Sequence, residues 1–449
     1  MSELNSGRGG LPSVLTSVPA GERVGLAFSG GLDTCTAVCW LQKNGAIPIA
    51  YTADLGQPDE ADIGAVAERA KMFGAQDARV VDCKRPLASA GLSALRCGAI
   101  HVTTAGKSYF NTTPLGRAVA GSILARRMHE DGVRIWSDGS TYKGNDIERF
   151  YRYALLVDRE LRFYKPWLDA TFVEECPGRE EMIGYLERAG KRFLRQGERA
   201  YSTDVNLLGA THEAEDLERL NVSMEIVEPI MGVKFWDETV QVDVEDVSIA
   251  FVGGIPIEIS GVTCAGPLEV MRAANAVGMR HGLGMSDQIE NRIVGAKSRG
   301  VYEAPGMALL HIAYERLVTA IHNEETIDVY RSLGRRLGGY LYAGRWFDPE
   351  ALMIRDSLER WFASIVTGEV VIRLRRGDDY TFINTSGPEL SYDSRRLSMD
   401  RVEDEPFTAA DRVGQLRIGE LDLTVSRDKL ALYERLGILD DAIRNAPTS

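Results

Sequence analysis

The feature that most constrains the fold is the run Ala27–Thr34, Ala-Phe-Ser-Gly-Gly-Leu-Asp-Thr, between the apolar stretch Val24–Phe28 and the helix-like Cys35–Gln42. When a strand is followed by two glycines and then by a helix, backbone N–H groups and the helix N-terminus come together at one point, where they attract anions. Ser29 and Thr34 add hydroxyl donors. The run therefore predicts a nucleotide-phosphate loop. The alternative is an ordinary strand-to-helix turn with a good cap.

The loop differs from the common phosphate-binding patterns. No lysine stands between Ser29 and Cys35, as a Walker loop requires, and no complete G-x-G-x-x-G pattern is present. The run instead resembles the Ser-Gly-Gly-x-Asp-[Ser/Thr] loop of the N-type ATP pyrophosphatases, the PP-loop superfamily. That resemblance implies an enzyme that splits ATP between its α and β phosphates and adenylates an oxygen.

Composition places the chain among soluble globular proteins of two or three domains, with 449 residues, 44% hydrophobic and 26% charged. A net charge of −13 argues against a nucleic-acid surface, so small molecules are the expected partners. Residues 1–20 lack a signal-peptide pattern, and no apolar run approaches the ~20 residues that span a bilayer. We therefore expect a cytoplasmic protein whose six cysteines stay reduced.

Short apolar runs alternate with helix-like segments up to about residue 167, which predicts an α/β fold with a doubly wound parallel sheet. The expected strands are Val24–Phe28, Ile47–Ala53, Arg79–Val81 and Arg134–Trp136. The expected helices are Glu60–Phe73 and Pro86–Cys97. In the first of these helices the residues expected to face inward are Ala61, Val66, Ala67, Ala70 and Phe73. Ligands of such sheets bind at the carboxyl ends of the strands. Ser29, Asp54 and Asp138 are expected to converge there.

The pattern changes after Pro177-Gly178, which predicts a nucleotide-binding domain at 1–180, a second α+β domain at 181–425 and a C-terminal helix at 426–449. Expected strands are Val240–Val244, Ser248–Val252, Ile255–Ile259, Val370–Leu374 and Thr381–Ile383. Expected helices are Met307–Ile321, Glu350–Ile365, with Ile354, Leu358, Trp361, Phe362 and Ile365 on one face, and a final helix after Ser426. That last helix could pack on its own domain or on a neighbouring subunit.

Three further segments are rich in glycine and polar residues: Gly139–Arg149, Tyr201–Glu213 and His281–Arg292. Asn145 and Asp146 could hold an amino-acid head group or a metal, and the Arg149 guanidinium could bind a carboxylate with two hydrogen bonds. Each segment also has a purely structural interpretation, because capped loops and structural histidines are common.

Together these segments resemble the argininosuccinate synthases, in particular their longer bacterial subtype. The resemblance extends from about Gly21 to Leu436, and its further marks are Thr52–Gln57 and Tyr109–Arg117. It implies a carbon–nitrogen ligase of arginine biosynthesis, which joins L-citrulline to L-aspartate through a citrullyl-adenylate and releases AMP and pyrophosphate. It also implies ATP with Mg²⁺ and a homotetramer assembled with help from the C-terminal helix.

The resemblance assigns roles residue by residue. ATP binding falls to Ala27, Phe28, Ser29, Gly30, Gly31, Leu32, Asp33, Thr34, Cys35, Ala53, Gly139, Thr141, Asp146 and Asp204. Citrulline binding falls to Tyr109, Asn145, Arg149, Ser202, Thr211, Glu213 and Glu290, and aspartate binding to Thr141, Asn145 and Asp146. Asp33, Asp146 and Asp204 are the catalytic candidates, and the metal ligand stays open. Cys35 replaces the usual serine; a thiol is a weaker donor, whereas a backbone N–H contact would survive.

Two other classes remain as alternatives. Another enzyme with this loop, such as a tRNA thiolase or a glutamine-dependent synthetase, would be expected to carry a basic surface with paired cysteines or a glutaminase domain, and the sequence indicates neither. A non-catalytic ATP sensor or scaffold would keep the loop without turnover. Only a turnover measurement separates that class from an enzyme.

Overall fold

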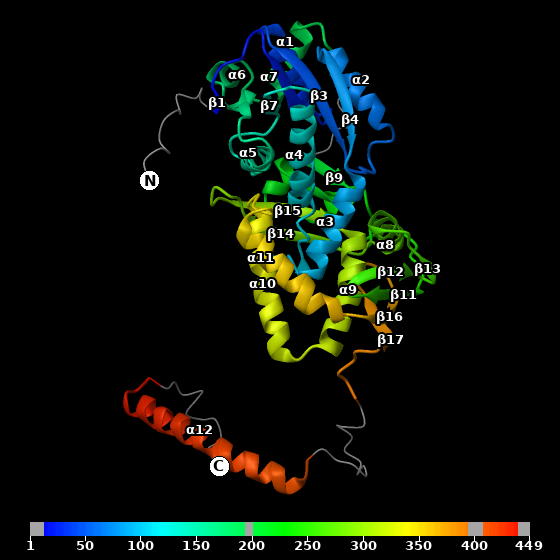
Figure 1. Cartoon of the computed structure of the whole chain (residues 1–449), viewed down its shortest axis with the longest axis vertical. Coiled ribbons are helices and arrows are strands. Elements are labelled where there is room, and N and C mark those ends of the chain that lie inside the picture. Colours follow the sequence, from blue (N-terminus) through cyan, green and yellow to red (C-terminus); the bar gives the residue numbers. More distant parts are fainter. Residues whose placement is uncertain (1–12, 194–200, 394–406, 439–449) are drawn as a thin grey trace, which may run out of the picture. The chain divides into compact units, whose positions relative to one another are not determined.

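The computed structural model describes residues 13–193, 201–393 and 407–438. The chain forms two compact units, residues 1–391 and 392–449, which we describe separately (Figure 1). The first unit holds the sheets and all of the predicted site residues. The described part of the second unit holds the long helix α12 (Ala409–Arg435).

A six-stranded parallel sheet forms the N-terminal part of the first unit. Its spatial order is β1 (Val14–Leu15), β8 (Arg162–Tyr164), β7 (Ile135–Asp138), β2 (Arg23–Ala27), β3 (Ile47–Asp54) and β4 (Asp77–Asp82). Every neighbouring pair runs parallel, and β2 pairs with both β3 and β7. The predicted α/β fold with a parallel sheet is confirmed. Strand order reverses at β2, the position where ligands of such sheets bind.

Helices cover both faces of this sheet. On one face, α1 (Leu32–Lys43), α2 (Ile63–Phe73), α6 (Ala170–Glu175) and α7 (Arg179–Arg188) share a core with Val24 and Leu26. On the other, α4 (Thr112–Glu130) and α5 (Asp146–Val157) pack on Tyr51 and Trp136. The predicted inward stripe of α2 is buried except for Ala61, which is exposed. Ala61 precedes the helix, because the Asp62 side chain caps it by accepting from the Gly64 N–H at 2.9 Å.

A four-stranded antiparallel sheet follows, in the order β14 (Met285–Asn291), β15 (Lys297–Glu303), β10 (Gly209–Glu213) and β9 (Ser202–Asn206). Ser202 and Asp204 therefore lie on a strand and do not begin a helix, which removes the capping interpretation of this segment. In the β9–β10 pair, Asp204 lies opposite Thr211. Two short 3₁₀ turns come after β10, η2 (Glu215–Glu218) and η3 (Met224–Ile226).

A five-stranded antiparallel sheet has the order β13 (Val262–Thr263), β12 (Ile255–Ile259), β11 (Glu245–Val252), β16 (Gly368–Leu374) and β17 (Tyr380–Ser386). Gly253 and Gly254, both at positive φ, make the predicted turn between β11 and β12. The strand predicted at Val240–Val244 is wrong. The backbone of Val240 makes other hydrogen bonds in place of strand pairing. Its N–H donates to the Asp237 carbonyl, and its carbonyl accepts from the Arg376 side chain.

Several helices join the sheets through one hydrophobic core. They are α3 (Lys84–Arg96), α8 (Pro267–His281), α9 (Pro305–Ile321), α10 (Glu324–Tyr342) and α11 (Pro349–Ser357). The first unit also contains the hairpin of β5 (Thr103–Thr104) and β6 (Lys107–Ser108), and the turn η1 (Pro166–Leu168), which follows β8. This shared core includes Leu87 and Leu115 from the N-terminal part together with Leu309 and Leu337 from the C-terminal part. The core therefore crosses residue 180, and the functional division proposed there stays a prediction.

The helix predicted over Glu350–Ile365 is interrupted. Helix α11 ends at Ser357, and a π-helical turn η4 (Leu358–Phe362) and a 3₁₀ turn η5 (Ala363–Ile365) follow it. Leu358 and Phe362 are buried as expected, whereas Trp361 is 77% exposed and Ile365 46%. A π turn holds more residues than an α turn, so it rotates the later side chains off the predicted face.

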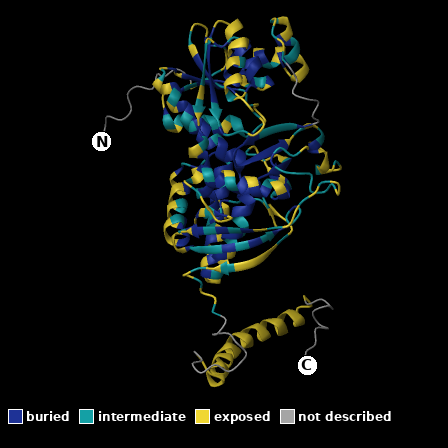
Figure 2. Cartoon of the chain, turned by 90° about the vertical axis from the view of Figure 1, so that its right-hand side faces the viewer, coloured by how far each residue is buried: buried dark blue, intermediate teal, exposed yellow. Residues whose placement is uncertain are grey.

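Helix α12 begins at Ala409, well before the predicted start after Ser426. Thr408 and Asp411 form a complete capping box at its N-terminus, which fixes the earlier start. All of its side chains are exposed in the described residues 407–438 (Figure 2). Residues 439–449 of the predicted C-terminal segment lie outside the described ranges.

All six cysteines are free, and five of them are buried. Among the described residues, no helix combines the length and apolar character needed to cross a bilayer.

Candidate functional site

The loop after β2 is shaped for close approach of an anion. Gly30 has φ +79°, and a Cβ there would lie 2.7 Å from Nη1 of Arg69. Gly31 is the N-cap of α1 and makes no side-chain cap, so the first turn of that helix is left for a ligand. The Ser29 and Thr34 hydroxyls lie 3.3 Å apart beside it. Together these groups form an anion cradle at the point where strand order reverses.

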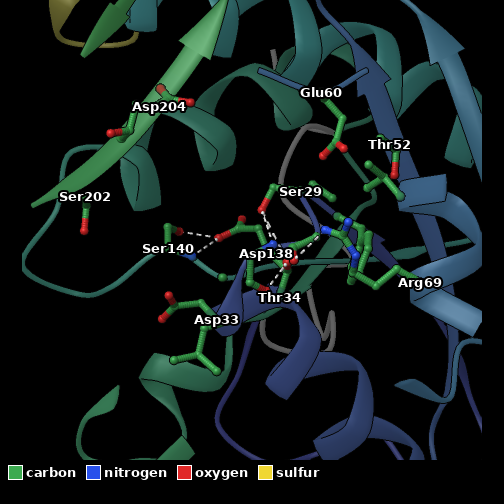
Figure 3. A pocket seen from close by; sticks show the side chains of 18 of the residues that line it. Ser29, Asp33, Thr34, Thr52, Glu60, Arg69, Asp138, Ser140, Ser202 and Asp204 are labelled. Carbon is green, nitrogen blue, oxygen red and sulfur yellow. Dashed lines mark hydrogen bonds between the residues drawn. The ribbon is translucent and has the colours of Figure 1, made fainter. Parts of the chain in front are cut away.

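A cavity of about 1350 Å³ opens over this loop (Figure 3). Typical small-molecule pockets measure roughly 300–1,000 Å³, so this one has room for more than one substrate. Most of the predicted ATP residues line it, together with Ser202: Ala27, Phe28, Ser29, Gly30, Gly31, Leu32, Asp33, Thr34, Ala53, Gly139, Asp146 and Asp204. The remaining predicted residues, Cys35, Thr141, Tyr109, Asn145, Arg149, Thr211, Glu213 and Glu290, do not line it.

Asp33 and Gly139 meet at the edge of the loop. A Cβ at Gly139 would lie 2.9 Å from Cβ of Asp33, so this position needs a glycine. Burial raises the pKa of the Asp33 carboxyl above its ordinary value, although Trp167 Nε1 donates to it at 3.1 Å. A carboxylate in this state favours a cation beside it, because a nearby positive charge stabilises its ionised form.

The predicted convergence of three strand-end residues holds for two of them. Ser29 and Asp138 line the cavity, whereas Asp54 is ion-paired with Lys84 and does not line it. The Asp138 carboxylate is itself fully engaged, accepting from Trp136 Nε1 at 2.7 Å, from Lys165 Nζ at 2.5 Å and from Ser140. Asp138 therefore fixes the turn that carries Gly139 and Ser140.

Arg117 joins the cavity to a second cluster of polar residues. Its Nε lies 2.8 Å from Asp146 Oδ2, and its Nη2 lies 2.8 Å from Asp204 Oδ2. The Thr113 hydroxyl continues the network, at 3.0 Å from Asp204 Oδ2 and 2.9 Å from the Thr211 hydroxyl. Burial alone would raise the pKa of Asp146, but the Arg117 and Arg149 guanidiniums outweigh it and hold that pKa below its usual range. Asp146 is therefore held as an anion beside the loop, and Arg117 bridges it to Asp204.

The second cluster, which we call the amino-acid cluster, consists of Tyr109, Asn145, Arg149, Glu290 and Tyr342. Arg149 Nη1 lies 3.1 Å from Asp146 Oδ1, so the cluster is continuous with the Arg117 network. Arg149 Nη2 and Glu290 Oε2 are buried and make no hydrogen bond within the described residues. Burial raises the pKa of Glu290 and lifts that of Tyr109 well above its ordinary value. One guanidinium nitrogen and one carboxylate oxygen in this cluster are thus buried without a partner in the described part of the chain, which suits the carboxylate and the ammonium of an amino-acid head group.

Two models of one protein family match the chain. The arginosuccinate synthase N-terminal HUP domain matches residues 23–191, and the arginosuccinate synthase C-terminal domain matches residues 201–425. The chain belongs to the argininosuccinate synthase family. Membership of this ATP-dependent ligase family agrees with the loop and with the polar network beside it.

Two solved structures of other proteins show weak similarity. One is described as a predicted subunit of tRNA methyltransferase from Methanocaldococcus jannaschii, with 17% identity over 38% of this chain and 89% of that chain and a TM-score of 0.23. The other is Leishmania major tyrosyl-tRNA synthetase in complex with tyrosinol, with 12% identity over 76% of this chain and 48% of that chain and a TM-score of 0.18. Scores this low carry no argument about the synthase fold.

The position where the synthase family usually has serine is turned away from the cavity. Cys35 is buried, and its Sγ donates to the Gly30 carbonyl at 3.4 Å. Its N–H donates to the Gly31 carbonyl at 2.9 Å, inside the first turn of α1. Burial raises the pKa of the thiol to about 12. Cys35 thus supports the loop from beneath.

Thr141 and Glu213 are exposed residues, the first in the loop before α5 and the second at the end of β10. Thr211 is buried and reaches the Arg117 network through Thr113.

Sequence reasoning missed three residues that organise the synthase site. Arg117 stood inside a recognised segment, and an arginine among the apolar residues of the first half of α4 is a signal for a buried ion pair. Arg69 lines the cavity and donates to the Gly30 carbonyl at 3.3 Å. Tyr342 ends α10, and nothing in its local sequence marks it as part of a site.

Proposed function

We propose that the protein catalyses the argininosuccinate synthase reaction, the ATP-dependent ligation of L-citrulline and L-aspartate to argininosuccinate with release of AMP and pyrophosphate. The observation that carries this proposal is the pairing of two features in one unit. A phosphate loop lines a large cavity, and Arg117 joins it to a buried cluster in which one nitrogen of Arg149 and one oxygen of Glu290 have no hydrogen-bond partner among the described residues. Such a pair suits a reaction between a nucleotide and an amino acid.

Citrulline is assigned to the amino-acid cluster. Arg149 Nη2 is placed to donate to an α-carboxylate, and Glu290 Oε2 to accept from an α-ammonium group. Leaving such groups buried without partners costs about 1–3 kcal/mol each, more when they are charged, and a zwitterion removes that cost. Tyr109 and Asn145 complete the pocket in this proposal, with Ser202, Thr211 and Glu213 toward the cavity.

ATP is assigned to the loop, where the glycine N–H groups and the first turn of α1 face the phosphates. The ureido oxygen of citrulline attacks the α-phosphorus, pyrophosphate leaves, and the aspartate amine then displaces AMP from the citrullyl-adenylate. This chemistry asks the protein to align reactants and to stabilise phosphate charge, so it requires no covalent nucleophile. Arg69 donates from Nη1 to the Gly30 carbonyl at 3.3 Å and so adds a cation beside the loop.

Asp146 and Asp204 are proposed to orient the amine of aspartate, with Thr141 and Asn145 completing the aspartate site. Arg117 holds both carboxylates in place, and their oxygens can accept hydrogen bonds from an ammonium group.

Mg²⁺ is the expected companion of ATP. Among the described residues no three His, Cys, Asp or Glu side chains gather as a preformed metal site. Asp33 could still act as a single protein ligand, because Mg²⁺ bound to phosphates needs only one or two protein carboxylates and keeps several waters. Asp33 would hold the ion, which would supply positive charge to the phosphates.

Two broader properties belong to the same proposal. The family resemblance implies a homotetramer, and α12 with its exposed Leu430, Tyr433 and Leu436 is the proposed assembly element. We also propose a cytoplasmic location, where the free thiols of all six cysteines would stay reduced.

The testing experiment measures AMP and pyrophosphate released by the purified full-length protein with ATP and Mg²⁺. The complete mixture with citrulline and aspartate is compared with mixtures that omit each amino acid. We expect stoichiometric AMP, pyrophosphate and argininosuccinate only in the complete mixture. Formation of ADP, or AMP release that does not depend on citrulline, would contradict the proposal and point to another enzyme with this loop. No turnover under any condition would favour an ATP sensor.

A further inference from the structure

Tyr342, the last residue of α10, contacts three of the residues assigned to citrulline. Its hydroxyl lies 2.9 Å from Asn145 Nδ2 and 2.9 Å from Glu290 Oε1. Its carbonyl accepts from Arg149 Nε at 2.9 Å, and the Arg149 guanidinium lies 4.8 Å from the centre of its ring. The side chain is buried. A single tyrosine therefore links residues that come from α5 and β14.

The chemistry of these groups fixes the direction of the hydrogen bonds. The Asn145 carbonyl oxygen is occupied, because Oδ1 accepts from the Ile293 N–H at 2.8 Å. Asn145 Nδ2 can then only donate, so the Tyr342 hydroxyl accepts from it and gives its one hydrogen to Glu290 Oε1. This arrangement leaves Oε2 of Glu290 open and favours the carboxylate form.

We propose that Tyr342 is a positioning residue that holds Asn145 and Glu290 in the arrangement that receives the head group of the amino-acid substrate. The inference rests on the proposed function, since it uses the citrulline assignment of those residues. It adds a contribution from α10 that the recognised sequence segments do not contain. Tyr342 acts through its neighbours and is not assigned a contact with the reacting atoms.

The surroundings of Glu290 predict how this positioning depends on pH. The titratable and charged groups that face it are Arg149, Arg292, Glu213, Tyr109, Tyr302 and Tyr342. Burial raises the pKa of Glu290, and the hydrogen bond from Tyr342 opposes that rise. Loss of the bond should therefore raise the Glu290 pKa further. His101 packs on the Tyr342 ring at 4.6 Å between centroids, but burial lowers its pKa to about 4, so it stays neutral.

The test compares Tyr342→Phe with Tyr340→Phe in the full-length enzyme. Tyr340 lies on the same helix, and within the described part of the chain its hydroxyl accepts from Arg336 Nε alone, at 3.2 Å. For Tyr342→Phe we expect the KM for citrulline to rise roughly tenfold to a hundredfold, with kcat and the KM for ATP changing far less. The acidic limb of kcat/KM for citrulline should shift upward by roughly one pH unit. Tyr340→Phe should leave all of these values unchanged.

A double-mutant cycle with Glu290→Gln gives a second readout. If Tyr342 acts through Glu290, adding Tyr342→Phe to Glu290→Gln should cause much less loss than Tyr342→Phe causes alone, with no shift of the acidic limb. Fully additive losses would overturn the proposal. So would an unchanged citrulline KM and pH profile in Tyr342→Phe, or equal losses for ATP and citrulline accompanied by a lower Tm. Absence of argininosuccinate formation by the unmodified enzyme would instead refute the proposed function.

Discussion

The phosphate loop and the amino-acid cluster lie in one unit but are built in opposite ways. The loop is a contiguous run, Ala27–Thr34, whose binding groups are backbone N–H groups and one helix terminus. The amino-acid cluster gathers side chains from residue 109 to residue 342, and its proposed binding groups are one nitrogen of the Arg149 guanidinium and one oxygen of the Glu290 carboxylate. A single side-chain substitution can therefore remove a proposed binding group of the cluster, whereas the backbone groups of the loop are not removed by most substitutions.

Replacing Arg117 should impair the phosphate loop and the amino-acid cluster to a similar extent. Arg117→Met removes the cation shared by Asp146 and Asp204, and a broken ion pair of this kind costs roughly 3–5 kcal/mol when buried and less when partly exposed, as here. We expect the largest loss of this series, with kcat/KM falling about a thousandfold or more for ATP, citrulline and aspartate alike. Arg126→Met on the same helix replaces an exposed arginine and serves as the control. Loss confined to one substrate would contradict the shared position of Arg117.

The same variant gives a stability test with a defined sign. The folded-state pKa of Asp146 lies below its ordinary value of 3.8, so its ionised form stabilises the fold above that value. This contribution is lost as the pH falls through the lower folded value. The Tm difference between the unmodified enzyme and Arg117→Met should therefore be largest at neutral pH and shrink in acid. A difference that grows in acid would show that Asp146 is not held ionised by Arg117.

Replacing Arg149 should affect the amino-acid cluster and leave the phosphate loop largely unaffected. Arg149→Ala removes the unpaired Nη2, so the KM for citrulline should rise about a hundredfold while the KM for ATP changes little. Steady-state kinetics with each substrate varied in turn provide the measurement. Arg159→Ala, an exposed arginine after α5, should be neutral. Equal losses for both substrates would indicate general collapse of the site.

A methyl group at Gly30 should affect the phosphate loop and weaken the binding of ATP. Gly30→Ala combines a φ of +79° with a Cβ only 2.7 Å from Arg69 Nη1, so the KM for ATP should rise roughly tenfold. Gly21 has the same φ with no atom within 4 Å, which makes Gly21→Ala a control for backbone strain alone. If both variants weaken ATP equally, close approach at the loop is not the cause.

Removing α12 should leave both the phosphate loop and the amino-acid cluster intact. Because no described residue of 407–438 is buried, deletion of 407–449 should change the Tm of the first unit by little. We expect sedimentation to show a smaller assembly and turnover to change least among these variants. An unchanged sedimentation profile would refute the assembly role of α12.

The sequence predicted the loop and the parallel sheet well because both depend on local patterns. Ala27–Thr34 carries its own glycines, hydroxyls and helix start, and β2 and β3 are largely apolar runs. The π turn after Ser357 could not be predicted, since an inserted residue in a helix leaves the hydrophobic pattern nearly unchanged.

Residue types alone suggested Asn145 and Arg149 as amino-acid ligands, Tyr109 and Glu290 came only from the family resemblance, and Tyr342 was missed. Tyr342 lies almost two hundred positions after Asn145, and no periodicity connects them. The open atoms on Arg149 and Glu290 are properties of the folded chain, because only burial makes an unpaired charge exceptional. The ligand roles of the individual residues remain predictions for the assays described above.

The hydrophobic core that joins Leu115 to Leu309 has a consequence for gene architecture. The two family models divide near residue 195, yet the core passes through that division without a break. A gene split at that point would yield fragments that each expose half of a core and are prone to aggregate. Chimeras of related synthases should therefore succeed only when matching core faces are inherited together, so the two halves are bound to evolve as one unit.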